Sequence, residues 1–257
     1  MNHRIAIIPC AGRASRMGDI KLPKALSNIR GKPALHHLLE SLDDYFSSYF
    51  IPINGDDYEK EIFQKNLPSK FIKKINFIKS IPGSGDGQAV LDAMSDKSFN
   101  KNASQVFVCW GDIYINKDNF IQSLISEAES HKTIESMLIP LRKTINPYVA
   151  YLFDDKKRIS RVAFTRRGEI IEKGLTDLSM FFINPSLIYD SLFELKKLGS
   201  NIKVNKEIES ELNFLDLIEF LYKKNRPVTY FEPNTEEAIF SFNTLIEAEL
   251  INKSQIK

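Results

Sequence analysis

Residues 5–26 read Ile-Ala-Ile-Ile-Pro-Cys-Ala-Gly-Arg-Ala-Ser-Arg-Met-Gly-Asp-Ile-Lys-Leu-Pro-Lys-Ala-Leu, and this stretch carries the strongest structural signal in the chain. The apolar run at its start is long enough for one buried strand. The loop that follows combines small residues, which let backbone N–H groups approach an anion, with fixed cations at Arg16 and Lys24. Its spacing is neither that of the phosphate loop ending in Gly-Lys-Ser/Thr nor that of the dinucleotide-binding Gly-x-Gly-x-x-Gly. The stretch therefore predicts a buried strand that leads into a cradle for a triphosphate.

The first half of the chain alternates strand and helix patterns. We predict strands at residues 5–9, 49–53, 75–78 and 106–110, and helices at residues 35–42, 58–64, 88–94 and 120–128. Such alternation is typical of an α/β fold with a doubly wound, mostly parallel sheet. Ligands bind such sheets at the carboxyl ends of the strands, and the polar motifs of this half all fall there.

From residue 139 the pattern changes to short strand candidates separated by charged turns. Strands are predicted at residues 148–153, 159–164 and 170–172, and the turns at residues 154–158 and 166–168 are interpreted as solvated rather than ligand-binding. We expect a small antiparallel annex around residues 139–178 within a single domain that spans residues 1–257. Further strands are predicted at residues 179–183, 228–231 and 239–242, and helices at residues 185–198, 214–222 and from Thr244, which begins a capping box.

Composition sets the broad class of the protein. The 257 residues carry a formal net charge of +2, with 43% hydrophobic and 26% charged residues, which is ordinary for a globular domain. This charge favours neither nucleic acid nor a membrane surface as a partner. No apolar stretch approaches the ~20 residues of a membrane span, and no signal-peptide pattern precedes the first strand, so we expect a cytoplasmic protein. The two cysteines, Cys10 and Cys109, lack metal-binding spacing and are interpreted as buried apolar residues.

A single carboxylate follows the predicted strand at residues 106–110. Gly111 lets the chain turn there, and Asp112 projects from the carboxyl end of the strand. A carboxylate at this point can hold a divalent cation, although a turn or helix-cap role explains it equally well.

Three motifs in order resemble the signature of the nucleotidyltransferases that make nucleotide sugars. They are Ala-Gly-Arg-Ala-Ser-Arg-Met at residues 11–17, Leu-Pro-Lys-Ala-Leu at residues 22–26 and Gly-Lys-Pro at residues 31–33. Ala14 stands where the family has a second glycine, a replacement that would clash if the position required a positive φ. A strand-to-loop junction that merely contains glycine and arginine is the alternative for the first motif alone. The resemblance implies a Rossmann-like nucleotidyltransferase fold.

The resemblance also implies roles for individual residues. It implies catalytic roles for Arg16 and Lys24, magnesium binding by Asp112 and Asn243, and nucleotide binding by Ala11, Gly12, Arg13, Ala14, Ser15, Gly83, Gly85, Asp86 and Gln88. A flexible loop without a ligand is the alternative for residues 83–88, and a position flanking a helix is the alternative for Asn243.

Acceptor binding is implied for three residues whose surroundings depart from the family pattern. Glu172 and Lys173 resemble its Glu-Lys-Pro segment, with Gly174 in place of the proline, and Asp177 stands where the family has asparagine. Glu211 and Asp216 resemble a further segment, Glu-Tyr-x-x-Thr-Asp. Because of these departures we expect an unusual acceptor.

The expected activity is the magnesium-dependent transfer of a nucleotidyl group from UTP or CTP to a sugar phosphate. The products would be pyrophosphate and a nucleotide-activated sugar for surface polysaccharide, and the expected partners are the triphosphate and the sugar phosphate, with no nucleic acid and no membrane. A cytidylyltransferase for a non-sugar phosphate ester and a catalytically silent nucleotide-sugar-binding protein are the alternatives. The base, the acceptor and the oligomeric state stay open.

Overall fold

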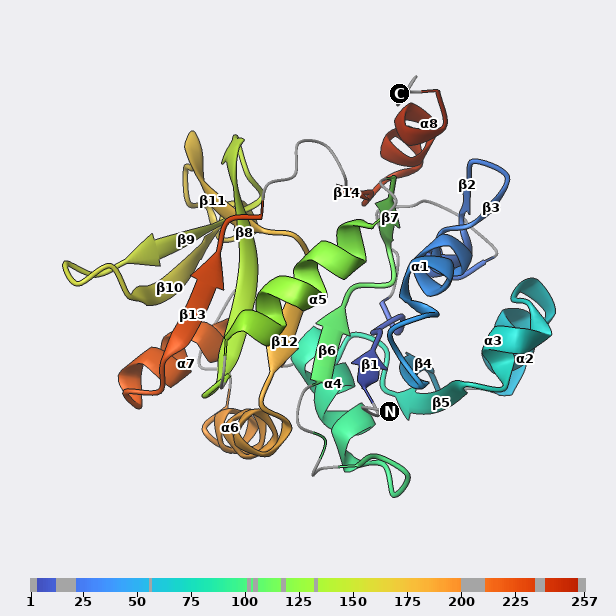
Figure 1. Cartoon of the computed structure of the whole chain (residues 1–257), viewed down its shortest axis with the longest axis horizontal. Helices are drawn as coiled ribbons and strands as arrows, with labels where there is room; N and C mark the ends of the chain where they lie inside the picture. Colours follow the sequence, from blue (N-terminus) through green and yellow to red (C-terminus); the bar gives the residue numbers. More distant parts are fainter. Residues whose placement is uncertain are drawn as a thin grey trace.

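The structure is a computed structural model, which describes residues 4–12, 22–55, 57–100, 103, 106–116, 119–131, 134–199, 211–233 and 239–253. A ten-stranded sheet runs through this part of the molecule in the order β10-β9-β11-β8-β12-β6-β1-β4-β5, with β13 paired to β8 (Figure 1). Two short ribbons, β14-β7 and β2-β3, lie beside it. The predicted α/β class, with helices around a mixed sheet and antiparallel strands at one side, is confirmed.

The helices and strands have the following bounds. The strands are β1 (Ile5–Ile7), β2 (Asn28–Ile29), β3 (Lys32–Pro33), β4 (Ser48–Asn54), β5 (Ile75–Ser80), β6 (Val106–Cys109), β7 (Ile113–Ile115), β8 (Met137–Ile145), β9 (Val149–Phe153), β10 (Ile159–Phe164), β11 (Lys173–Asp177), β12 (Met180–Ile183), β13 (Val228–Phe231) and β14 (Ile239–Ser241). The helices are α1 (Ala34–Leu42), α2 (Asp57–Asn66), α3 (Ser69–Ile72), α4 (Asp86–Ser95), α5 (Phe120–Ser130), α6 (Pro185–Lys197), α7 (Asp216–Lys223) and α8 (Leu245–Lys253), with short 3-10 turns η2 (Lys24–Leu26) and η3 (Thr165–Arg167).

The parallel half of the sheet contains β5, β4, β1 and β6. Strand β1 lies between β4 and β6, with Ile7 opposite Phe50 on one side and Val108 on the other. Every residue of β1 and β6 is buried, as expected for strands covered on both faces. Because these strands run in the same direction, the loops that follow β1 and β6 meet at one edge of the sheet.

Helices cover both faces of the sheet, and the side chains of β1 and of Ile8, which follows it, alternate between these faces. Ile5 and Ile7 pack in the hydrophobic cluster that contains the buried faces of α4, α6 and α7. Ala6 and Ile8 pack in a second cluster with α1, α2, α3 and α5. Figure 1 shows α5 crossing one face of the sheet, and it shows α6 and α4 at the lower side of the sheet in this view. The period of two along the strand therefore gives three layers around the parallel half.

The observed strands differ from the predicted pattern at two places in the antiparallel half and at a third in the β14-β7 ribbon. Strand β8 was not predicted; its beginning pairs with β12 and β13 and its end pairs with β11. The strand predicted at residues 170–172 is wrong, because the chain pairs only from Lys173 onward and Ile170 is 94% exposed. Strand β7, also not predicted, pairs with β14. The annex is therefore joined to the main sheet through β8.

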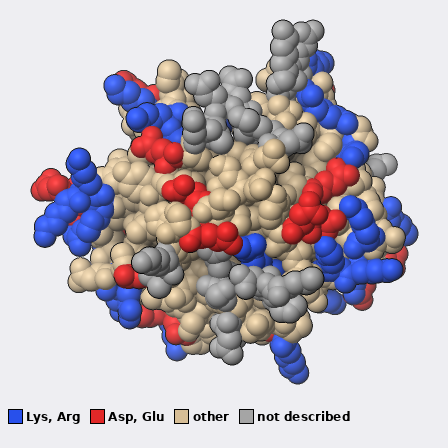
Figure 2. Space-filling view, viewed as in Figure 1, with Lys and Arg blue, Asp and Glu red and all other residues tan. Residues whose placement is uncertain are grey.

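Acidic and basic side chains are interspersed on the surface. On the face drawn in Figure 2, acidic side chains lie between groups of basic ones, and the two signs do not separate into halves. No helix in the described part of the chain combines the length and apolar character that crossing a membrane requires.

Candidate active site

A cavity of about 490 Å³ opens at the edge of the sheet where β1 and β6 end. Its walls come from the loops after β1, β5 and β6, from the start of η2 and from the segments near Glu211 and Asn243. The described lining residues are Pro9, Cys10, Ala11, Gly12, Lys24, Ala25, Ile81, Gly83, Gly85, Asp86, Ala89, Trp110, Gly111, Asp112, Arg166, Glu211 and Asn243. Residues from six of the segments singled out in the sequence, those containing Gly12, Lys24, Gly85, Asp112, Glu211 and Asn243, thus meet in one place. Arg13, Ala14, Ser15 and Arg16 lie outside the described residues.

Three predicted residues converge on a single point of the cavity. The ammonium of Lys24 donates to Oδ2 of Asp112, and also to Oδ1 of Asn243 at 3.1 Å. It lies 5.6 Å from the centre of the Phe242 ring. The side chains of Lys24 and Asp112 are 17% and 26% exposed, so this ion pair is partly shielded from water. One cation is therefore held between a carboxylate and an amide oxygen.

Local backbone packing places Asp112 and Asn243 side by side. The N–H of Gly111 donates to the carbonyl of Pro9 at 3.4 Å, and a Cβ on Gly111 would lie 2.5 Å from Sγ of Cys10, so this close approach of the two loops requires glycine. In the β14-β7 ribbon, Ser241 pairs with Ile113. Asn243 follows Ser241 by two residues and Asp112 directly precedes Ile113, so the ribbon brings Asn243 and Asp112 together.

The predicted capping box fixes the chain just beyond Asn243. Oγ1 of Thr244 accepts the N–H of Glu247 at 3.2 Å, and Oε2 of Glu247 accepts the N–H of Thr244 at 3.2 Å. This reciprocal pair satisfies backbone donors at the start of α8. The capping box is confirmed, and it holds the Asn243 segment against the cavity.

The glycine-rich loop before α4 forms another wall of the cavity. The carboxylate of Asp86 accepts the N–H of Phe214 at 2.7 Å and that of Gly87 at 2.9 Å. Desolvation raises the pKa of Asp86 above its ordinary value, while the two N–H donors and the Arg166 charge act in the opposite direction. Asp86 thus holds the segment that begins at Glu211 against the glycine-rich loop.

Gln88 is placed differently from Gly83, Gly85 and Asp86. Its Nε2 donates to Oδ1 of Asp92 at 2.6 Å, and Oδ2 of Asp92 accepts the hydroxyl of Ser80 at 2.6 Å. Gln88 is not among the described residues that line the cavity. Its side chain supports α4 against β5 in this structure, and a nucleotide contact would require it to leave Asp92.

The cavity has one cation that the sequence analysis did not assign. Arg166, in the turn after β10, lines the cavity. Its neighbour Arg167 donates to both oxygens of Asp216, at 2.7 and 2.9 Å, and lies 4.0 Å from the Phe164 ring centre. Arg167 therefore anchors the turn while Arg166 reaches the cavity. The interpretation of this turn as merely solvated missed Arg166, because a run of charges in sequence does not show which of them faces a neighbouring loop.

The three predicted acceptor residues do not line the described cavity. Glu172 and Lys173 are exposed, and the carbonyl of Glu172 accepts the N–H of Asn146 at 2.7 Å. Asp177 accepts the hydroxyl of Tyr151 at 3.1 Å and the N–H of Ser179 at 2.8 Å. Burial raises the pKa of the Asp177 carboxyl. Their roles in acceptor binding stay predictions.

The donor set around Lys24 suits a hard divalent cation. Carboxylate and amide oxygens are the ligands that magnesium prefers, and magnesium commonly takes only one or two protein carboxylates together with the phosphates of the substrate. Within the described residues, no three His, Cys, Asp or Glu side chains cluster as a metal site. A metal held here would therefore depend on Asp112, Asn243 and oxygens brought by a ligand.

Comparison with solved structures supports the fold. The chain is similar to the structure of HddC from Yersinia pseudotuberculosis complexed with GMP-PN, with a TM-score of 0.66, 18% identity and 98% coverage of both chains. The HddC structure described without that compound gives the same TM-score and identity. At this identity the likeness concerns the fold.

Comparison of sequences identifies the family. The chain is 25% identical over 263 residues to the bifunctional protein GlmU of Buchnera aphidicola. This alignment covers 99% of the chain and 54% of the relative. It is 35% identical over 126 residues to GlmU of Methanococcus maripaludis, covering 48% of this chain and 28% of the relative. The chain spans about half the length, or less, of the curated relatives it matches. The profile of the MobA-like NTP transferase domain matches residues 6–166, more than half of the chain. The chain belongs to this family of nucleotidyltransferases, as its motifs predicted.

Proposed function

We propose that this chain transfers a nucleotidyl group from UTP or CTP to a sugar phosphate, releasing pyrophosphate and giving a nucleotide-activated sugar for surface polysaccharide. The observation that carries the proposal is the convergence of Lys24, Asp112 and Asn243 in one cavity. The cavity volume of about 490 Å³ lies within the range of about 300–1,000 Å³ that small-molecule sites occupy.

The proposed site divides the substrates along the cavity. The loop after β1 and Lys24 would hold the triphosphate, with Arg16 as a further cation for its outer phosphates. Gly83 and Gly85 lie on the opposite loop, where backbone groups without side chains can approach the edge of a base. Arg166, which comes from the antiparallel half, would meet the phosphate of the acceptor. Of the described cations that line the cavity, Lys24 would thus meet the triphosphate and Arg166 the acceptor phosphate.

The reaction needs positioning and charge stabilisation more than proton transfer. An oxygen of the acceptor phosphate attacks the α-phosphorus in line, and the bond from that phosphorus to the pyrophosphate oxygen breaks. The nucleophile is already anionic, so no base is required. Lys24 would stabilise the charge that develops on the α-phosphate. Magnesium, held by Asp112 and Asn243, would neutralise triphosphate oxygens when it is bound.

Pyrophosphate release tests this proposal directly. The purified chain is assayed with each of four nucleoside triphosphates against a panel of sugar phosphates and a phosphorylated amino alcohol, with magnesium or with EDTA. We expect release with UTP or CTP and one sugar phosphate, and none with EDTA.

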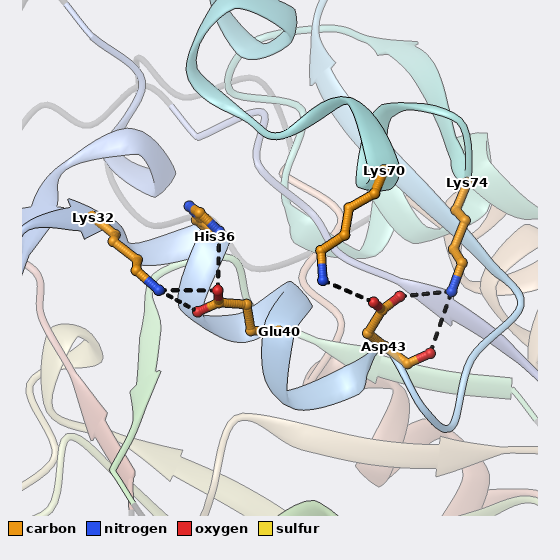
Figure 3. A network of polar contacts seen from close by, with 6 residues as sticks. All are labelled: Lys32, His36, Glu40, Asp43, Lys70 and Lys74. Atoms are coloured by element: carbon orange, nitrogen blue, oxygen red, sulfur yellow. Dashed lines mark hydrogen bonds and ion pairs between the residues drawn. The ribbon is translucent and has the colours of Figure 1, made fainter.

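Matched aspartate variants locate the chemistry. Asp112→Ala should lose activity by orders of magnitude, while Asp43→Ala, which removes a carboxylate that binds surface lysines, should not (Figure 3). If pyrophosphate is released only with the phosphorylated amino alcohol, the acceptor is a non-sugar phosphate ester. If the chain binds nucleotide but releases no pyrophosphate with any acceptor, it is a catalytically silent binding protein.

A further inference from the structure

The Lys24 ammonium occupies the position that the proposed function gives to a metal ion. It donates to the same two oxygens, Oδ2 of Asp112 and Oδ1 of Asn243, that would ligate magnesium. The ring of Phe242 covers another side of the ammonium at 5.6 Å. The cation site is therefore filled by a cation of the chain itself, whose reach comes from a flexible four-carbon stem.

A metal ion and the Lys24 ammonium would compete for these oxygens. A divalent ion bound to Asp112 and Asn243 would lie within a few ångströms of the ammonium, and like charges at that distance repel strongly in a partly shielded site. Lys24 must move away before the ion binds. Leaving Asp112 costs the lysine a charge-assisted hydrogen bond, and an anionic phosphate oxygen would replace it with an equivalent one.

We propose that Lys24 locks the metal site of this enzyme until a triphosphate arrives. In this proposal, which rests on the proposed function, the phosphates of the nucleotide draw the ammonium away from Asp112 and Asn243. The two oxygens are released at the moment when the triphosphate brings further oxygen ligands. The same lysine thus excludes free divalent ions from the empty cavity and stabilises the phosphate in the filled one.

Binding of Mn²⁺ alone tests the lock, because Mn²⁺ prefers the same oxygen ligands and its free form is measured by electron paramagnetic resonance. Without nucleotide, we expect Lys24→Met to bind Mn²⁺ at least tenfold more tightly than the wild type. Lys70→Ala is the matched control, since Lys70 also pairs with a carboxylate, Asp43, at 3.1 Å but on the surface (Figure 3). Its Mn²⁺ affinity should equal that of the wild type.

Further variants keep the experiment decisive. Adding Asp112→Asn to Lys24→Met should abolish the gain, which places the bound ion at Asp112. If Lys24→Met does not fold, as judged by its thermal melt, Lys24→Gln removes the same charge with a polar side chain. Equal Mn²⁺ affinity in the wild type and in a folded Lys24 variant would overturn the lock.

The lock and the proposed function fail in different ways. A wild type that releases pyrophosphate while Lys24→Met gains no Mn²⁺ affinity refutes the lock alone. A wild type that releases none with any substrate, while Lys24→Met binds Mn²⁺ more tightly, refutes the proposed reaction and leaves a lysine-locked cation site.

Discussion

Replacing Gly85 with alanine tests how the glycine-rich wall of the cavity is built. Gly85 has φ of +96°, and an added Cβ would lie 2.8 Å from both the N and the C of Leu212, and closer still to its carbonyl oxygen. This neighbour cannot easily withdraw. The N–H of Leu212 donates to the backbone carbonyl of Ser84 at 2.9 Å, and the carbonyl of Leu212 accepts the N–H of Gly87 at 2.8 Å.

Two costs add at Gly85, and a control separates them. Gly85 has φ of +96° and ψ of 158°, a region that only glycine routinely occupies, and placing an L-residue there costs roughly 1–3 kcal/mol. Forcing a methyl group against a fixed backbone costs about 1–3 kcal/mol more, the range for overpacking. Gly31→Ala is the control, because Gly31 has φ of +88° but no atom within 4 Å of the added Cβ. The free energy of unfolding of Gly31→Ala should therefore fall only by the cost of the positive φ.

The assay compares urea and thermal unfolding of the wild type and the two variants. Since 1 kcal/mol shifts the Tm of a chain of this size by about 2–4 °C, Gly85→Ala should melt several degrees below Gly31→Ala. Its nucleotide KM should also rise, because the displaced wall belongs to the cavity. If both variants melt together, Leu212 does not clasp the loop and the reasoning fails.

Three further predictions follow from the site. Lys24→Ala should lower kcat by about 10²–10³-fold with an unchanged melt, because one preorganised charge is lost; wild-type turnover would contradict its catalytic role. Burial raises the pKa of Asp86 in the folded state, so the wild type loses stability as pH rises from the ordinary aspartate pKa through the raised one. Asp86→Asn lacks this loss and should gain stability relative to the wild type over that pH window in urea titrations; a stability difference that does not change with pH would contradict the shift. Arg166→Gln should raise the acceptor KM by at least about tenfold with little change in Tm, whereas Arg167→Gln should destabilise the fold by about 1.5–3 kcal/mol, since its hydrogen bonds to a carboxylate anchor the turn. Equal effects of the two arginine variants on Tm and KM would remove the distinction.

Elements with a strong local pattern could be predicted from the sequence. Strands β1 and β6 are short apolar runs, and they are buried in the predicted parallel half. Strand β8 was missed because its period is mixed. Its first five residues are all buried, including Pro140, whereas its last four alternate between half-buried positions, Arg142 and Thr144, and exposed positions, Lys143 and Ile145. A strand that is central at one end and one-sided at the other gives no single pattern.

Residues of the cavity were predicted wherever chemistry and strand ends coincide. Asp112 was found because a lone carboxylate follows a buried strand, and Lys24 because it completes a phosphate-binding loop. Arg166 was not found, since its position depends on how Arg167 binds Asp216, a pair 49 residues apart. A sequence shows that both arginines are charged but gives no sign of which one is already neutralised.

The contact between Lys24 and Asp112 shows where reasoning from motifs stops. Each motif predicts the ligand that a residue will bind, so lysine is assigned to phosphate and aspartate to metal. In the structure these residues, 88 apart in the chain, neutralise one another, because charges of opposite sign attract in a partly shielded site. The energetic cost of breaking that pair is part of binding the substrate. The contacts of ligand-binding residues are therefore best predicted for two states, one in which they bind the ligand and one in which they bind each other.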